Sequence, residues 1–103
     1  MKKIILITGA TSGFGKAITY TFAAAGWNCI ITGRRQDRLD SIASDLQTKY
    51  PIQVLSLAFD VQDRKTVTDT LCNLPEEWQA IDILVNNAGL ALGRDSFENA
   101  NLD

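Results

Sequence analysis

The sequence contains no histidine, which excludes histidine-activated nucleophiles and most zinc sites. Its two cysteines, Cys29 and Cys72, lie far apart, and we interpret them as reduced, partly buried thiols of a cytoplasmic protein. No apolar run is longer than a strand, so no segment is expected to cross a membrane. The formal net charge of −2 disfavours general binding to nucleic acid or to anionic membranes.

The 103 residues, of which 46% are hydrophobic, are enough for one domain at most. Short apolar runs alternate with patterns of helical period, which is typical of a parallel α/β sheet with right-handed crossovers. The predicted strands span 4–7, 29–32, 53–59 and 81–85, and the later helices span 37–49 and 63–72, followed by a helical turn at 76–79. This alternation predicts the N-terminal half of a doubly wound Rossmann fold with strand order 3-2-1-4.

The predicted helices differ in how they cover such a sheet. The apolar positions on one stripe of each helix are Ala17, Ile18, Phe22 and Ala25 in the first, Leu39, Ile42, Ala43 and Leu46 in the second, and Val67 and Leu71 in the third. In this winding the first two helices cover one face of the sheet and the third covers the other. Part of one face and the edge of the fourth strand are then bare, so we expect marginal stability for these residues alone.

A glycine-rich turn follows the first strand and precedes the first helix. Glycines allow a phosphate to approach the backbone, and a helix N-terminus offers unpaired N–H groups and a positive dipole end. The turn therefore predicts an anion site. The candidate binding residues are Gly9, Ala10, Thr11, Ser12, Gly13, Phe14 and Gly15.

A P-loop is the competing interpretation of this turn, because Lys16 follows Gly15. The position five residues before Gly15 is Ala10, however, and Ala17 stands where the magnesium-binding hydroxyl is needed. These two residues argue against ATP or GTP hydrolysis.

The second predicted strand ends in Gly33-Arg34-Arg35 and carries no acidic residue there. In dinucleotide folds an acid near this place binds the ribose 2′-hydroxyl. A carboxylate repels a 2′-phosphate, whereas guanidinium groups bind it in a bidentate manner. Arg34 and Arg35 therefore predict NADP(H) rather than NAD(H).

The combined motifs resemble those of short-chain dehydrogenases/reductases. The resemblance covers residues 1–92 and rests on Thr8-Gly9-Ala10-Thr11-Ser12-Gly13-Phe14-Gly15, on Asp60, and on Asn86-Asn87-Ala88-Gly89 after the fourth strand. It implies that Asp60, with Val61, binds the adenine amino group, although Asp60 is also a good helix N-cap. Asn87, Ala88 and Gly89 are expected near the cofactor ribose, with asparagine amides tying neighbouring strand ends together.

Three further segments are similar to one branch, the NADP-dependent 3-hydroxy acid (L-serine/L-allo-threonine) dehydrogenases. These segments are 33–39, 74–78 and 87–93. The resemblance implies hydride exchange between the nicotinamide and a secondary alcohol or ketone, with a small hydroxy acid such as serine as substrate. It also implies a cytoplasmic homotetramer.

The family's catalytic residues are not found in this sequence. The family uses a Tyr-x-x-x-Lys pair with an upstream Ser and an Asn, but Ala24 stands four residues after Tyr20, and Val54 four after Tyr50. We therefore assign no catalytic residue, and no metal site. Residues 1–92 are interpreted as a dinucleotide-binding half-domain, and 93–103 as a polar segment at which the sequence is cut off. The alternative is a non-catalytic NADP(H)-binding module.

Overall fold

The computed structural model describes residues 3–59 and 63–87, in which parallel strands alternate with helices. The strands are β1 (Ile4–Thr8), β2 (Asn28–Gly33), β3 (Val54–Ala58) and β4 (Ile83–Asn86). The helices are α1 (Gly13–Ala24), α2 (Gln36–Lys49), α3 (Arg64–Cys72) and the short 3-10 helix η1 (Glu76–Trp78). The sheet order is β3-β2-β1-β4, which confirms the prediction.

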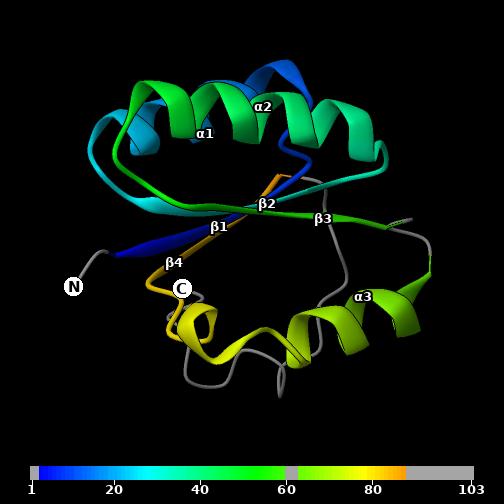
Figure 1. Cartoon of the computed structure of the whole chain (residues 1–103). Coiled ribbons are helices and arrows are strands. Elements are labelled where there is room, and N and C mark those ends of the chain that lie inside the picture. Colours follow the sequence, from blue (N-terminus) through cyan, green and yellow to red (C-terminus); the bar gives the residue numbers. More distant parts are fainter. Residues whose placement is uncertain (1–2, 60–62, 88–103) are drawn as a thin grey trace.

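Strand β1 lies at the centre of this arrangement and is parallel to both of its neighbours. Its Ile5 is in register with Cys29 of β2 on one side and with Ile83 of β4 on the other. Because all the strands run the same way, their carboxyl ends meet at one edge of the sheet. The glycine turn after β1 therefore lies between the ends of β2 and β4 (Figure 1).

Two cores form, one on each face of the sheet. Helices α1 and α2 cover one face and α3 covers the other, as predicted (Figure 1). The core under α1 and α2 includes Ile5, Ile7, Cys29, Ile31, Leu39, Ile42, Ala43 and Leu46, and the core over α3 includes Ile4, Leu6, Ile30, Val67 and Leu71. The predicted inward positions of α2 and α3 are thus confirmed. Alternate residues of β1 enter opposite cores, as the pleat of a strand requires.

The buried side of α1 differs from the predicted apolar stripe. Its buried residues are Gly15, Thr19 and Ala23, whereas Ala17 and Ala25 are exposed and Ile18 and Phe22 are half-buried. Small residues at a spacing of four let the helix lie close to the sheet, and the larger side chains flank the contact. The Thr19 hydroxyl donates to the carbonyl of Gly15, so its burial leaves no unpaired donor.

Strand β4 begins two residues later than predicted, at Ile83 instead of residue 81. The carboxylate of Asp82 accepts the N–H of Ile4 at 2.9 Å, and the N–H of Asp82 is donated to the carbonyl of Ile4. The carboxylate of Asp82 therefore replaces a backbone carbonyl as hydrogen-bond acceptor at the place where β1 and β4 begin to pair. Strand β4 begins only after this contact, at Ile83.

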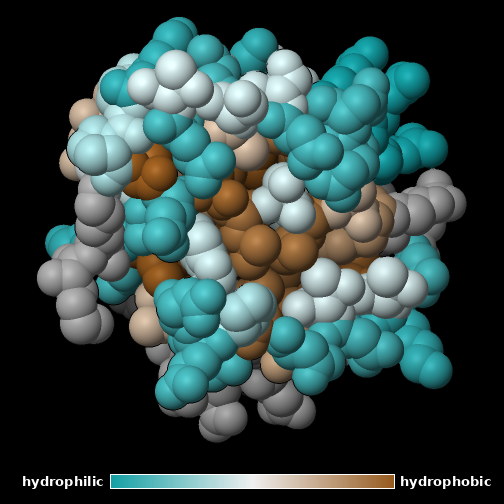
Figure 2. All heavy atoms as spheres, in the orientation of Figure 1, coloured by the Kyte–Doolittle hydropathy of each residue, from teal (hydrophilic) through white to brown (hydrophobic). Residues whose placement is uncertain are grey.

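The outer strands of the described sheet are only half-buried. This holds for Ile83, Leu84 and Val85 in β4 and for most of β3. Figure 2 shows apolar atoms reaching the surface between the two helix layers, where Figure 1 places β3. The position of β4 at the edge of the described sheet agrees with expectation, and the marginal stability inferred from it stays a prediction.

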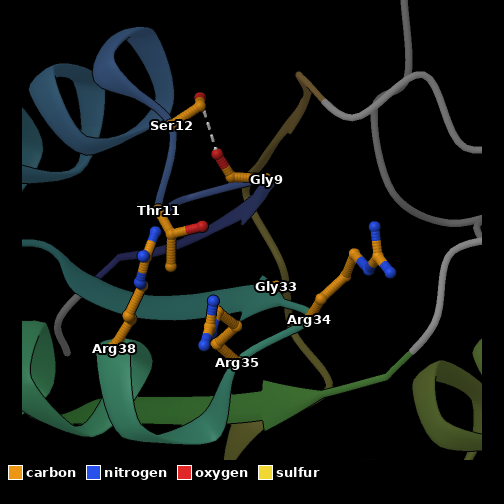
Figure 3. Close-up of a pocket in the computed structure, with 7 residues that line it drawn as sticks. All are labelled: Gly9, Thr11, Ser12, Gly33, Arg34, Arg35 and Arg38. Atoms are coloured by element: carbon orange, nitrogen blue, oxygen red, sulfur yellow. Dashed lines mark hydrogen bonds between the residues drawn. The ribbon is translucent and has the colours of Figure 1, made fainter.

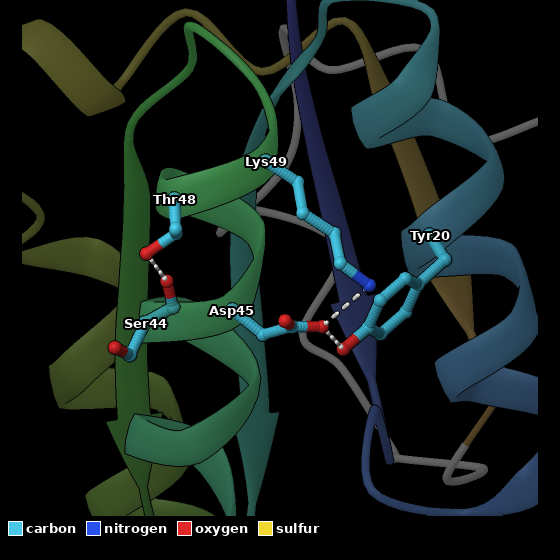
Figure 4. Close-up of polar contacts among 5 residues, drawn as sticks. All are labelled: Tyr20, Ser44, Asp45, Thr48 and Lys49. Carbon is cyan, nitrogen blue, oxygen red and sulfur yellow. Dashed lines mark hydrogen bonds and ion pairs between the residues drawn. The ribbon is translucent and has the colours of Figure 1, made fainter.

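A polar cluster joins α1 to α2 on the outside of the molecule (Figure 4). The Tyr20 hydroxyl donates to Asp45 at 2.5 Å, and Lys49 forms an ion pair with the same carboxylate at 3.3 Å. The hydrogen bond to Asp45, aided by burial, raises the pKa of Tyr20 to about 12. The same bond, with Lys49 nearby, lowers the pKa of Asp45.

Replacing Tyr20 with Phe removes this donor, and we expect the free energy of unfolding at pH 7 to fall by about 1 kcal/mol. Because the folded pKa is raised above the ordinary value of about 10, the contribution is complete below pH 10 and is lost as the pH rises towards 12. Urea unfolding of wild type and Tyr20→Phe at pH 7, 9 and 11 measures this difference. Tyr50→Phe is the control, and a difference that does not shrink above pH 10 would contradict the assignment.

Candidate phosphate-binding site

The glycine turn is held in one conformation by its own backbone and by Ser12. Gly9 adopts a φ of 66°, in the left-handed region that glycine tolerates best. Ser12 caps α1 by accepting the N–H of Gly15 at 3.2 Å. The N–H groups of Gly13 and Phe14, the first helical residues, have no partner within the helix. This arrangement supports the predicted anion site.

The turn also contacts β2, the strand that leads to the arginines. The N–H of Ala10 donates to the carbonyl of Thr32 at 3.0 Å, and the side chain of Ala10 is fully buried. In this conformation Ala10 therefore presents neither a free N–H nor an accessible atom to a ligand. Phe14, in contrast, is 62% exposed and is the one large hydrophobic residue so exposed in the described part of the chain.

A cavity of about 590 Å³ lies between the glycine turn and the start of α2 (Figure 3). Its lining residues are Gly9, Thr11, Ser12, Gly33, Arg34, Arg35 and Arg38. The volume is within the range of small-molecule sites. The structure thus brings the predicted turn and the predicted arginines to the same cavity.

Arg38 is a cavity residue that the sequence analysis missed. It lies three residues after Arg35, in the first turn of α2, and it lines the same cavity as Thr11 (Figure 3). The spacing of three was the available signal, because residues three apart share a helix face. Arg35 is the N-cap of α2, and its side chain makes no cap hydrogen bond. The positive end of the helix dipole at the start of α2 therefore adds to the positive charge of the arginines at the cavity.

Asn86, the last residue of β4, and Asn87 after it tie strand ends together as expected. The hydroxyl of Thr8 donates to the side-chain oxygen of Asn86 at 3.1 Å. The side-chain amide of Asn87 donates to the carbonyl of Gly9 at 3.1 Å and to the hydroxyl of Ser12 at 2.8 Å. The end of β4 is therefore attached directly to the glycine turn.

Four of the predicted contacts lie outside the described residues: Asp60, Val61, Ala88 and Gly89. Within the described part, no three potential metal-ligating side chains come together. No helix there has the length and hydropathy needed to span a membrane.

The two cysteines lie in different surroundings. Burial raises the pKa of Cys29 to about 12, which makes its thiol unreactive at neutral pH. Cys72 is exposed, so the expectation of a partly buried thiol was wrong for this residue. Cys72 is the last residue of α3 and directly follows the buried Leu71.

A family model described as short chain dehydrogenase matches residues 3–103. Sulfoacetaldehyde reductase 2 of Chromohalobacter salexigens is 45% identical over 99% of this chain and 40% of its own length. The NADP-dependent 3-hydroxy acid dehydrogenase YdfG of Escherichia coli (strain K12) is 46% identical over 97% of this chain and 39% of its own. The chain thus spans about 40% of the length of these curated relatives.

Two solved structures are also similar to this chain. The closed form of a serine dehydrogenase complexed with NADP+ is 49% identical, with a TM-score of 0.69 over 87% of this chain and 35% of that one. The L-sorbose reductase of Gluconobacter frateurii, complexed with NADPH and L-sorbose, is 32% identical, with a TM-score of 0.78 over 94% of this chain and 40% of that one.

Two glycines of the turn provide a matched test of this geometry. A Cβ atom at Gly15 would overlap the carbonyl oxygen of Gly9 and lie 2.9 Å from the amide nitrogen of Asn87, whereas a Cβ at Gly13 meets nothing within 4 Å. We expect Gly15→Ala to lower the free energy of unfolding by about 1–3 kcal/mol. Gly13→Ala should leave it unchanged or raise it by up to about 1 kcal/mol. Urea unfolding at pH 7 measures both, and equal effects would rule out this packing of the turn.

Proposed function

Because the chain belongs to the short-chain dehydrogenase family, we propose that it is the NADP(H)-binding part of a short-chain oxidoreductase. The observation that carries the proposal is the cavity shared by the glycine turn and the arginines after β2. The turn and the N-terminus of α1 would hold the pyrophosphate, because their N–H groups are neutral donors that need no counter-charge. The cavity and its donors fit this cofactor.

The 2′-phosphate of NADP(H) is assigned to Arg34 and Arg35, with Arg38 as a third cation. All three side chains are exposed at the cavity, where they can turn towards a ligand. Guanidinium groups suit the planar pairs of phosphate oxygens. Relatives and structural neighbours named for NADP or NADPH support this preference.

The proposed reaction is hydride exchange with a secondary alcohol or ketone, and the bound nicotinamide supplies or accepts the hydride. A small 3-hydroxy acid such as serine is the proposed substrate, supported by the relatives named 3-hydroxy acid dehydrogenase and serine dehydrogenase. The described residues bind and orient the cofactor. The proton-transferring residues are proposed to lie outside these 103 residues. Residues 1–92 are proposed to form the dinucleotide-binding half-domain, and the whole protein is proposed to be a cytoplasmic homotetramer.

The cofactor assignment predicts a selective loss when the arginines are removed. In the full gene product, Arg34→Ala combined with Arg35→Ala should raise the Kd for NADPH by at least about 100-fold, because charged hydrogen bonds are worth about 1.5–3 kcal/mol each. The Kd for NADH should change little, because NADH lacks the 2′-phosphate. Fluorescence titration measures both, with Lys65→Ala as a control for charge. Equal affinity of the wild type for NADPH and NADH would refute the preference.

The catalytic assignment depends on what else the gene product contains. We expect the intact mass of the native protein to be well above the 11.3 kDa of these residues and the purified protein to oxidise L-serine with NADP+. Mass spectrometry and an absorbance assay for NADPH provide the measurements. A native mass near 11.3 kDa with NADP+ binding but no turnover would favour the non-catalytic module instead.

A further inference from the structure

Strand β3 forms one edge of the described sheet and pairs there with β2 (Figure 1). The N–H of Phe59 donates to the carbonyl of Gly33 at 3.0 Å, so the backbone N–H of Phe59 faces β2. Because the backbone groups of successive strand residues point to opposite sides, every second residue of 53–59 faces away from β2. The residues whose backbone groups point outward are Val54, Ser56 and Ala58.

An outward row of N–H and C=O groups can pair with a strand of another chain. Strand β3 suits a second copy of itself, because it is an apolar, extended segment with the sequence Val-Leu-Ser-Leu-Ala. In an antiparallel ladder, hydrogen-bonded pairs recur at every second residue. A two-fold axis at Ser56 would place Ser56 opposite its own copy and Val54 opposite Ala58. The outward groups of the two copies would then match.

Gln47, on α2, occupies one of these outward donors. Its side-chain oxygen accepts the N–H of Val54 at 3.0 Å. In the two-fold pairing this N–H would have to reach the carbonyl of Ala58 in the second copy. Because the pairing is symmetric, the same donor is needed at both ends of the ladder. Gln47 therefore withdraws a hydrogen bond from each end.

Asp40, also on α2, lies beside the middle of the same strand. The hydroxyl of Ser56 donates to the carboxylate of Asp40 at 3.2 Å. The side-chain amide of Gln36 donates to the same carboxylate at 2.7 Å and to the hydroxyl of Ser56 at 3.3 Å. These contacts fix the carboxylate next to Ser56. The two-fold pairing would bring the two Ser56 residues together, each with its carboxylate, and like charges opposite each other destabilise a sheet.

We propose that α2 closes the β3 edge against pairing with a second copy of this chain, with Gln47 occupying the N–H of Val54 and Asp40 supplying repulsion at Ser56. Gln36, Asp40 and Gln47 lie on one stripe of α2, which explains how a single helix reaches two points of the strand. None of the three lines the cavity with the arginines. The closing of the edge is therefore independent of the proposed cofactor site.

The test removes both contacts and leaves the helix intact. In the full gene product, Gln47→Ala frees the N–H of Val54, and Asp40→Asn removes the charge but keeps an acceptor for Ser56. At a protein concentration on the order of 100 µM, light scattering should give the double variant about twice the molar mass of the wild-type assembly. Hydrogen exchange in 53–59 should slow on association, because the outward amides become paired.

A third substitution shows whether the association uses this edge. Ala58→Pro removes an outward N–H that the pairing with β2 does not use, and edge strands tolerate proline at such positions. Added to the double variant, it should restore the wild-type mass. A wild-type mass for the double variant would overturn the proposal. Association that persists after Ala58→Pro, or that leaves exchange in 53–59 unchanged, would overturn it as well, because the association would then come from another surface or from unfolding.

Two controls separate the edge contacts from general effects of substitution. Gln47→Glu keeps a side-chain oxygen for the N–H of Val54, so this variant should have the wild-type mass. Thr48→Ala combined with Asp69→Asn matches the double variant in changing one polar side chain of α2 and one carboxylate. The hydroxyl of Thr48 donates to the carbonyl of Ser44 within α2, and Asp69 lies on α3 over the other face. This control should also keep the wild-type mass, and association in it would contradict the assignment to β3.

Discussion

The burial of β1 is the constraint on which the rest of the structure depends. All five of its residues are buried, with a core on each face and a parallel strand on each side. A strand enclosed in this way must end at the middle of the carboxyl edge. The turn that follows it is then flanked by the residues that leave β2 and those that leave β4. The cavity with its arginines and the attachment to Asn87 are both consequences of this central position.

Close packing of α1 on the sheet adds a second condition. Gly15, Thr19 and Ala23 are the buried residues of α1, and a Cβ atom at Gly15 would collide with the carbonyl of Gly9. This brings the first turn of α1 close enough to the end of β1 for Ser12 to share its hydroxyl with the carbonyl of Gly9. The shape of the anion site is therefore decided by packing beneath it as well as by the glycine motif itself.

The sequence was sufficient to predict the strand order, the turn and the arginines, because these depend on apolar runs, glycine spacing and charge. It was not sufficient for the buried face of α1, because threonine, glycine and alanine give no strong hydropathy signal. Arg38 was missed because its role depends on where α2 begins. The start of β4 was misplaced because it depends on a contact between Asp82 and Ile4, residues far apart in the sequence. The direction of the Asn87 amide likewise requires three-dimensional contacts.

The proposed cofactor carries two anionic groups, and the site would bind them by different means. The turn offers neutral N–H groups in a fixed arrangement, whereas the cavity wall near α2 offers guanidinium groups on exposed side chains. The chain as a whole is slightly acidic, so it gives no general attraction for an anion. Attraction must come from the local cluster of arginines, and at about 0.1–0.15 M salt the interaction between exposed charges decays over a distance of about 8–10 Å. Higher ionic strength should therefore weaken the discrimination between NADP(H) and NAD(H) more than the binding of the pyrophosphate that both share.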